Sequence, residues 1–83
     1  MDKYYVYVLE DESGRKYKGM TNNLERRLQE HKRGKTITTS KMKSLRLIYS
    51  EFFPSKFEAR KRETYFKTAA GRRFLQQKLR GMA

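Results

Sequence analysis

The residues with the clearest chemical potential lie between Tyr4 and His31. Tyrosines occur there in two short aromatic runs, and Arg27 precedes the only histidine of the chain, His31, by four residues. On a helix this spacing places a guanidinium and an imidazole on one face. Such groups can move protons or bind phosphate, and packing alone does not need them. A metal ligand and a surface for a polyanion would have to come from the rest of the chain.

Two strands are expected to carry the tyrosines. Residues 3–9 alternate so that both faces are apolar or aromatic, which predicts a strand buried on both faces and central in its sheet. A polar turn comes next, with Gly14 available for a positive φ. Residues 15–20 then return as a second strand and complete a β-hairpin. Gly19 would allow a bulge, or the close approach of another backbone or a ligand.

A first helix is expected to position the arginine and the histidine. Asn22 is the predicted N-cap, in a weak form of the capping box. Leu24 and Leu28 are four residues apart and predict the buried stripe. Arg27 and His31 lie along the edge of that stripe, where a side chain can be half buried and still reach a groove.

The remaining chain predicts one more strand and further helices. Residues 35–46 show no clear period and are rich in hydroxyls and lysines, so we expect a loop suited to phosphate contact. Residues 46–53 predict a third strand. A capping box at residues 55–58 starts a helix that is expected to run to about Ala70.

The predicted fold class is α/β (α+β), with the order ββαβα plus a C-terminal helix. Helices would pack on a three-stranded, mainly antiparallel sheet. The 83 residues suffice for a single domain, with its core at about residues 3–70 and a helical tail at residues 71–83.

Composition narrows the partners and the compartment. With no cysteine, neither a disulfide nor a thiolate metal site is possible. No apolar run is long enough to span a bilayer and no secretory signal is present, so a cytoplasmic protein without a membrane partner is expected. The formal net charge is +12, and 17 of the 21 basic residues follow residue 20. This charge favours nucleic acid as the partner over a merely soluble charged surface.

Five positions together show a resemblance to a known family. The chain resembles the GIY-YIG nuclease superfamily from about Tyr4 to Lys67, and it looks most similar to small stand-alone bacterial members, many of them uncharacterised. The first motif of the family falls on Tyr5-Val6-Tyr7 and the second on Tyr17-Lys18-Gly19. The helical arginine, the residue four positions later and the metal-binding glutamate of the family match Arg27, His31 and Glu63.

The resemblance implies hydrolysis of phosphodiester bonds with one divalent ion, Mg²⁺ or Mn²⁺, on Glu63. Tyr7 and Tyr17 would flank the attacking water, and their pKa values would have to be lowered by Arg27, the metal and the positive field. Arg27 would contact phosphate in the transition state. His31 would share proton transfer or contact phosphate.

Simpler roles remain open for each of these residues. Glu63 could be a surface carboxylate among basic neighbours, and the tyrosines could be ordinary sheet aromatics. Arg27 could pair with a carboxylate such as Glu30, and His31 could be structural. This sequence also has no asparagine after Asn23, whereas many active members carry one late in the domain.

Two functions therefore compete. The first is a DNA endonuclease with little sequence specificity, acting in repair or recombination, as a monomer or weak homodimer. Its substrates would include branched or damaged DNA, with RNA ranking below DNA. The alternative is a DNA- or RNA-binding module of the same fold with weak or no catalysis. The candidates for contact with the nucleic-acid backbone are Lys18, Lys32, Arg33, Lys35, Lys41, Lys43, Arg60 and Lys67.

Overall fold

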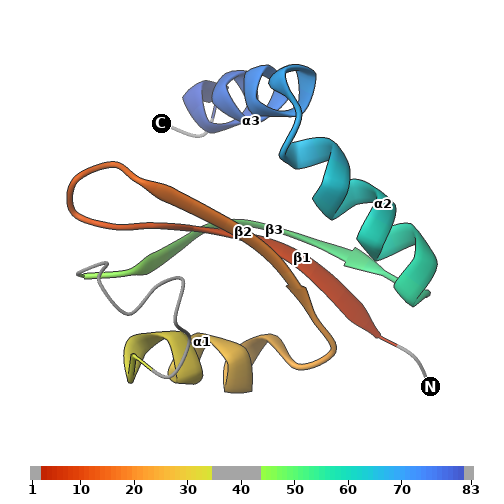
Figure 1. The fold of residues 1–83 in the computed structure, drawn as a ribbon, viewed down its shortest axis with the longest axis horizontal. Helices are drawn as coiled ribbons and strands as arrows, with labels where there is room; N and C mark the ends of the chain where they lie inside the picture. Colours follow the sequence, from red (N-terminus) through yellow and green to blue (C-terminus); the bar gives the residue numbers. More distant parts are fainter. Residues whose placement is uncertain (1–2, 35–43, 82–83) are drawn as a thin grey trace.

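A three-stranded antiparallel sheet separates α1 from α2 and α3 in the computed structural model (Figure 1). The structure describes residues 3–34 and 44–81. The elements in chain order are β1 (Tyr4–Glu10), β2 (Lys16–Thr21), α1 (Leu24–Lys32), β3 (Arg46–Phe53), α2 (Lys56–Phe66) and α3 (Ala69–Gly81). This arrangement confirms the predicted fold class and element order. No helix in the described part of the chain is long and apolar enough to cross a membrane.

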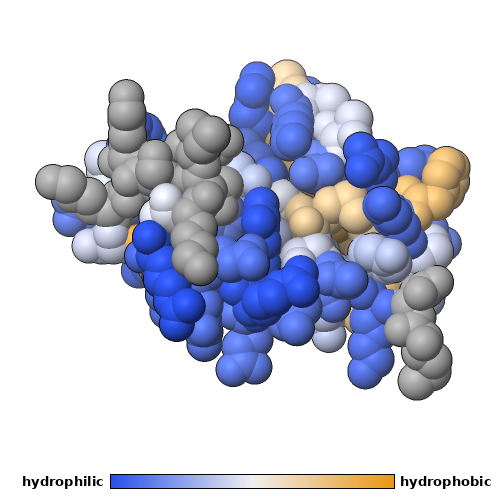
Figure 2. All heavy atoms as spheres, turned by 60° about the horizontal axis from the view of Figure 1, so that its bottom comes forward, coloured by the Kyte–Doolittle hydropathy of each residue, from blue (hydrophilic) through white to orange (hydrophobic). Residues whose placement is uncertain are grey.

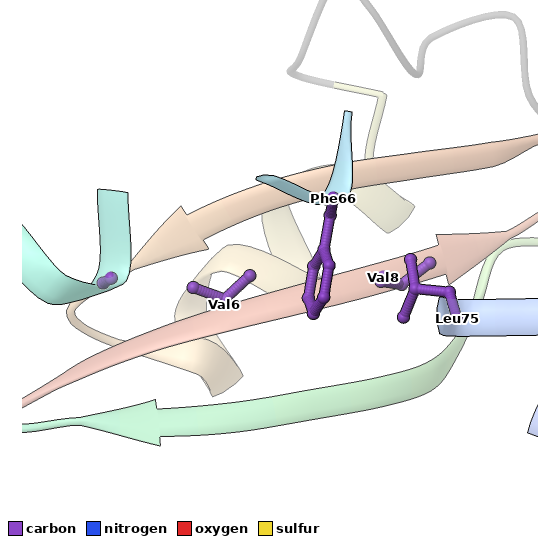
Figure 3. Close-up of a cluster of buried hydrophobic side chains, with 5 residues drawn as sticks. Val6, Val8, Phe66 and Leu75 are labelled. Atoms are coloured by element: carbon purple, nitrogen blue, oxygen red, sulfur yellow. The ribbon is translucent and has the colours of Figure 1, made fainter. Parts of the chain in front are cut away.

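The side chains of the central strand, β1, pack on both faces of the sheet. The strand order is β2-β1-β3, which confirms the prediction of a central first strand. Side chains alternate along a strand, so Val6 and Val8 face α2 and α3. There they form the core with Ala59, Phe66 and Leu75 (Figure 3). Tyr7, between the two valines, faces α1 instead. Burial of each large apolar side chain contributes roughly 1.5–3 kcal/mol.

The hairpin turn is closed by a buried carboxylate. Asp11 Oδ1 accepts hydrogen bonds from the Ser13 backbone N–H at 3.0 Å, the Ser13 hydroxyl at 2.8 Å and the Arg15 backbone N–H at 2.8 Å. Gly14 adopts φ +89°, as the polar turn predicted. The turn fixes the pairing in which Tyr7 lies opposite Gly19.

The first helix begins one residue later than predicted. Asn23, and not Asn22, is the N-cap, and its side chain accepts a hydrogen bond from the Arg26 backbone N–H at 3.0 Å. Asn22 Oδ1 instead accepts a hydrogen bond from Arg26 Nη2 at 3.3 Å. Two adjacent asparagines are equally good caps, so the local pattern could not choose between them.

The expected continuation of the second helix to Ala70 is wrong. α2 ends at Phe66 and α3 begins at Ala69. The hydroxyl of Thr68 caps the new helix by accepting a hydrogen bond from the Gly71 N–H at 3.1 Å. A Cβ on Gly71 would collide with the carbonyl oxygen of Tyr65. Gly71 therefore lies within the first turn of α3, where its lack of a side chain allows a tight turn, or elbow, between α2 and α3.

Candidate active site

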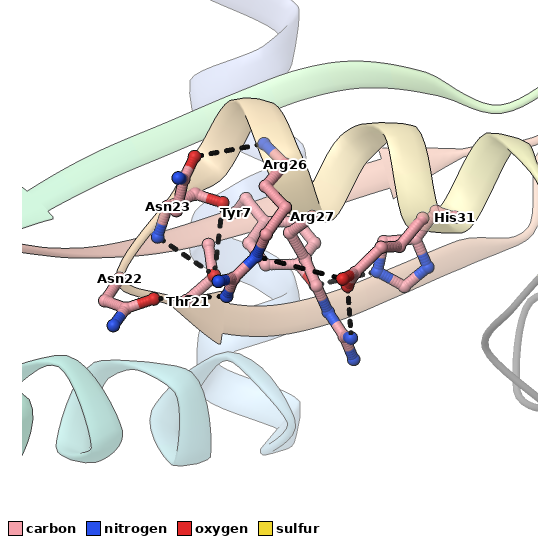
Figure 4. Close-up of polar contacts among 8 residues, drawn as sticks. Tyr7, Thr21, Asn22, Asn23, Arg26, Arg27 and His31 are labelled. Atoms are coloured by element: carbon pink, nitrogen blue, oxygen red, sulfur yellow. Dashed lines mark hydrogen bonds and ion pairs between the residues drawn. The ribbon is translucent and has the colours of Figure 1, made fainter.

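Four of the five predicted catalytic side chains meet on the α1 face of the sheet. Figure 4 shows three of them, Tyr7, Arg27 and His31. The tyrosine–histidine cluster consists of Tyr7, Tyr17, Arg27 and His31. Tyr7 Oη lies 2.8 Å from His31 Nε2, and Arg27 Nε donates a hydrogen bond to Tyr7 Oη at 3.4 Å. The ring of Tyr17 lies 4.9 Å from the imidazole and 6.1 Å from the ring of Tyr7, measured between centroids. The structure thus joins residues that are up to 24 positions apart.

A glycine makes room for the two tyrosines. Gly19 lies opposite Tyr7 in the β1–β2 pairing. A Cβ at Gly19 would come within 2.7 Å of Tyr7 Oη and 2.9 Å of Tyr17 Cε2. The sequence led us to expect a bulge at Gly19, or the close approach of another backbone or a ligand, whereas the groups that approach it are the side chains of Tyr7 and Tyr17. The absence of a side chain on β2 allows the hydroxyl of Tyr7 to lie over the strand and reach the helix.

The histidine is buried more deeply than the leucines beside it. His31 is 2% exposed and is the buried residue of α1, whereas Leu24 and Leu28 are half buried. The leucine stripe predicted the side of the helix that faces the sheet, but the expectation of a half-buried His31 at its edge is wrong, because the imidazole is the buried side chain of α1. The buried imidazole has a polar partner in the Tyr7 hydroxyl, as a buried polar group requires.

Burial governs the protonation of the cluster. Tyr7 is 0% exposed. Its burial raises its pKa to about 12, although the hydrogen bond from Arg27 acts in the opposite direction. Burial, followed by the charge of Arg27, lowers the pKa of His31 below its ordinary value of 6.5, with Glu30 opposing. Arg27 does favour ionisation of Tyr7, as expected, but burial outweighs it.

A consistent set of hydrogen bonds results from these protonation states. Both Tyr7 and His31 are neutral at pH 7. We assign the Tyr7 hydroxyl as the donor to His31 Nε2, because its oxygen accepts from Arg27. The three groups then form one chain from a surface guanidinium to a buried imidazole.

Arg27 is held in place from both sides. Its Nη1 donates to Glu30 Oε1 at 3.0 Å, and its Nε donates to Tyr7. These two hydrogen bonds raise the pKa of Arg27, so it is a permanent cation. The side chain is 33% exposed. The pair with Glu30, which was the simpler alternative for Arg27, is present and orients a guanidinium that also reaches the cluster.

Glu63 comes from the other side of the sheet. Ala59 and Phe66 are the buried residues of α2 and mark its inner face. By helical geometry Arg62 and Glu63 flank that face on opposite sides. Arg62 pairs with Glu51 on β3 at 2.8 Å, so Glu63 is directed toward β2. The free edge of β2 is where a ligand could touch both the cluster and this carboxylate.

A metal ion could bind only through a sparse donor set. Within residues 3–34 and 44–81, no three His, Cys, Asp or Glu side chains gather closely enough to hold a metal. The side chain of Glu63 is 17% exposed, and its Oε2 lies 3.5 Å from Lys67 Nζ. One carboxylate suits Mg²⁺ if waters and a substrate phosphate supply the other ligands. The residues present therefore fit an ion that binds together with a phosphate.

The predicted basic contacts fall in several places. Hydrophilic side chains dominate the face that carries α1 (Figure 2). Lys32, Arg33, Arg60 and Lys67 are exposed and Lys18 is half buried. Lys35, Lys41 and Lys43 lie outside the described residues.

Sequence reasoning missed two further cations, Lys16 and Arg72, which line a groove with Lys18. The alternation of β2 could have placed Lys16 beside Lys18, because residues two apart share a face. Only the packing of α3 brings Arg72 to them.

Comparisons with known proteins agree with this architecture. Residues 3–78 match the model of the GIY-YIG catalytic domain. A UPF0213 protein of Bacillus licheniformis is 36% identical over 83 residues, covering 95% of this chain and 86% of that protein. A UPF0213 protein of Limosilactobacillus reuteri is 44% identical over 69 residues, covering 80% of this chain and 72% of that protein.

A solved structure shows the same fold. The solution NMR structure of a UPF0213 protein from Bacillus halodurans has a TM-score of 0.58 and 33% sequence identity, covering 90% of this chain and 83% of that chain. The family model spans nearly the whole sequence and includes both strands of the hairpin and all three helices up to residue 78. The chain therefore belongs to the GIY-YIG catalytic-domain family, which is a nuclease family.

Proposed function

We propose that this protein is an endonuclease that hydrolyses phosphodiester bonds in DNA, with one divalent ion and little sequence specificity. The observation that carries the proposal is the continuous Arg27–Tyr7–His31 network beside Tyr17. Glu63 supports it, because this carboxylate is directed toward the same edge strand from the opposite face. Membership of a nuclease family supports a nucleic-acid substrate.

The tyrosine and the histidine would act together as the proton acceptor. Tyr7 cannot serve as a base alone, since its pKa of about 12 keeps it protonated at neutral pH. It can accept the proton of the attacking water at Oη while its own proton passes to His31 Nε2, 2.8 Å away. The water oxygen would then bond to phosphorus as the P–O bond to the leaving oxygen breaks, and the leaving alkoxide would take a proton from solvent. The attacking water would approach beside the half-exposed Tyr17 and would displace packed groups to reach the buried Tyr7 hydroxyl.

Arg27 would stabilise the charge that develops on the phosphoryl oxygens. Its guanidinium is already oriented by Glu30 and Tyr7 before substrate arrives, so little reorganisation is needed in the reaction. Removing one such preorganised donor typically costs roughly 10²–10³ in rate. A divalent ion held by Glu63, when bound, would polarise the scissile phosphate.

The deciding experiment compares cleavage of supercoiled, nicked and branched DNA with Mg²⁺ or Mn²⁺. Glu63→Gln and Arg27→Ala should each abolish metal-dependent cutting, while binding of labelled DNA persists. Glu58→Gln is the matched control, because Glu58 is an exposed carboxylate on the same helix, and it should cut like the wild type. Cutting that survives Glu63→Gln would refute the proposed metal site. Faster cutting of branched than of linear DNA would support a role in repair or recombination.

A binding module without catalysis is the second candidate. The complete burial of Tyr7 favours it, because a water must displace packed groups to reach that hydroxyl. The ion pair of Glu63 with Lys67 also favours it, since this pair gives the carboxylate a partner without a metal. DNA or RNA binding with no cutting of any substrate would establish this function.

A further inference from the structure

A basic groove lies on the face of β2 opposite the tyrosine–histidine cluster. It has a volume of about 250 Å³ and is lined by Gly14, Lys16, Lys18, Arg72, Leu75 and Gln76. We propose that this groove binds a backbone phosphate of the nucleic acid, outside the reaction centre, and that Lys18 and Arg72 are its principal ligands. This inference rests on the proposed nucleic-acid substrate and adds a second anchoring point to it.

The first argument is the placement of like charges. Arg72, Lys16 and Lys67 all act electrostatically on Lys18, and together with burial, the largest cause, they lower its pKa. Lys16 is paired with Glu10 at 3.2 Å and Lys67 with Glu63 at 3.5 Å. Within the described chain, no carboxylate lies at ion-pair distance from Lys18 or Arg72. Two cations held together without a counter-charge repel each other, and an anion between them removes that repulsion.

The second argument is that rigid elements hold these cations. Lys18 pairs with Val8 in the sheet, and Val8 belongs to the core, so the backbone beneath Lys18 is fixed. Arg72 follows Gly71, whose contact with the Tyr65 carbonyl sets the start of α3. The floor of the groove includes the buried Leu75. A site on a strand and a helix is preorganised, whereas flexible lysines on a loop are not.

The third argument is the position of the groove relative to Glu63. Lys67 is the common neighbour, because it forms the ion pair with Glu63 and also acts electrostatically on Lys18. One nucleic-acid strand can therefore place one phosphate near Glu63 and another in the groove. Contacts of this kind set the register of the substrate without reading its sequence.

The test measures DNA binding in EDTA over a series of salt concentrations, with a fluorescein-labelled duplex and anisotropy as the readout. The Lys18→Gln/Arg72→Gln double variant should lower the slope of log K against log salt by about 1, since the single phosphate contact in the groove contributes about 0.9. Arg73→Gln is the matched control, because Arg73 is the exposed neighbour of Arg72 on α3 and does not line the groove. The control should keep the wild-type slope.

Thermal unfolding provides a second readout. The double variant should unfold at the same or a higher temperature, because the repulsion between the cations is gone. Equal losses of slope in the double variant and in Arg73→Gln would overturn the proposal and leave only a general positive field. A marked fall in melting temperature would also overturn it, since the cations would then be structural. Because no metal is present, the result is independent of whether the protein cleaves DNA.

Discussion

Substitution of Gly19 by alanine should damage the tyrosine–histidine cluster and the fold together. The new Cβ would lie 2.7 Å from Tyr7 Oη and 2.8 Å from its Cζ. Tyr7 is fully buried between the sheet and α1, so its ring cannot swing into solvent. It must shift within the core, and its hydrogen bond with His31 at 2.8 Å then lengthens or breaks.

The expected change in the free energy of unfolding of Gly19→Ala combines three contributions. Overpacking a filled site costs about 1–3 kcal/mol. A buried polar group that loses its partner costs about 1–3 kcal/mol. Replacing glycine by alanine in a strand offsets about 0.5–1 kcal/mol of this loss, because alanine loses less conformational entropy on folding. The expected net loss in the free energy of unfolding therefore spans about 1–5 kcal/mol and centres on about 3 kcal/mol, a central value that lowers the melting temperature of a domain of this size by roughly 12–24 °C.

Chemical denaturation and thermal melting of Gly19→Ala measure this loss directly. Gly81→Ala is the control, because no heavy atom lies within 4 Å of a Cβ there, and it should be neutral or up to about 1 kcal/mol more stable. If Gly19→Ala unfolds within about 0.5 kcal/mol of the wild type, the Tyr7 ring is not confined as described, and the reasoning from the glycine fails.

Two further predictions concern stability. The lowered pKa of His31 means that the unfolded chain binds a proton more readily, so this contribution to stability is complete above about pH 6.5 and is lost as the pH falls below that value. Between about pH 7 and about pH 5, the melting temperature of His31→Gln should fall less steeply than that of the wild type. Equal slopes would contradict the lowered pKa of His31. Glu51→Gln should cost about 1–3 kcal/mol, because Glu51 accepts hydrogen bonds at 2.8 and 3.1 Å from Arg62, whose charge is partly buried. Urea denaturation should show this loss but almost none for the exposed Glu58→Gln, and equal effects would show that the pair with Arg62 adds nothing.

Features that depend on local periodicity could be predicted from the sequence. Alternation identified the central strand and its two faces, because the period of two is fixed by strand geometry. The four-residue spacing of Arg27 and His31 predicted that they share a face, and both do contact Tyr7. These relationships need no knowledge of how the helices pack.

The remaining features depend on tertiary contacts. The burial of Tyr7, and with it the direction of its pKa shift, is decided by how closely α1 packs on the sheet. The elbow between α2 and α3 depends on the close approach of Gly71 to the Tyr65 carbonyl, which no local pattern contains. The basic groove likewise exists only because α3 brings Arg72 next to β2.

The two faces of β1 have different roles, and this limits the sequence changes that the strand can accept. Val6 and Val8 secure the core on one face, while Tyr7 serves the candidate active site on the other. Single substitutions on one face can be compensated there without disturbing the other. Insertion or deletion of one residue in this strand would instead exchange the two faces over part of its length. Tyrosine would then enter the hydrophobic core and valine the polar cluster. We therefore expect β1 to vary by substitution. Within the β1–β2 hairpin, we expect changes in length only in the turn.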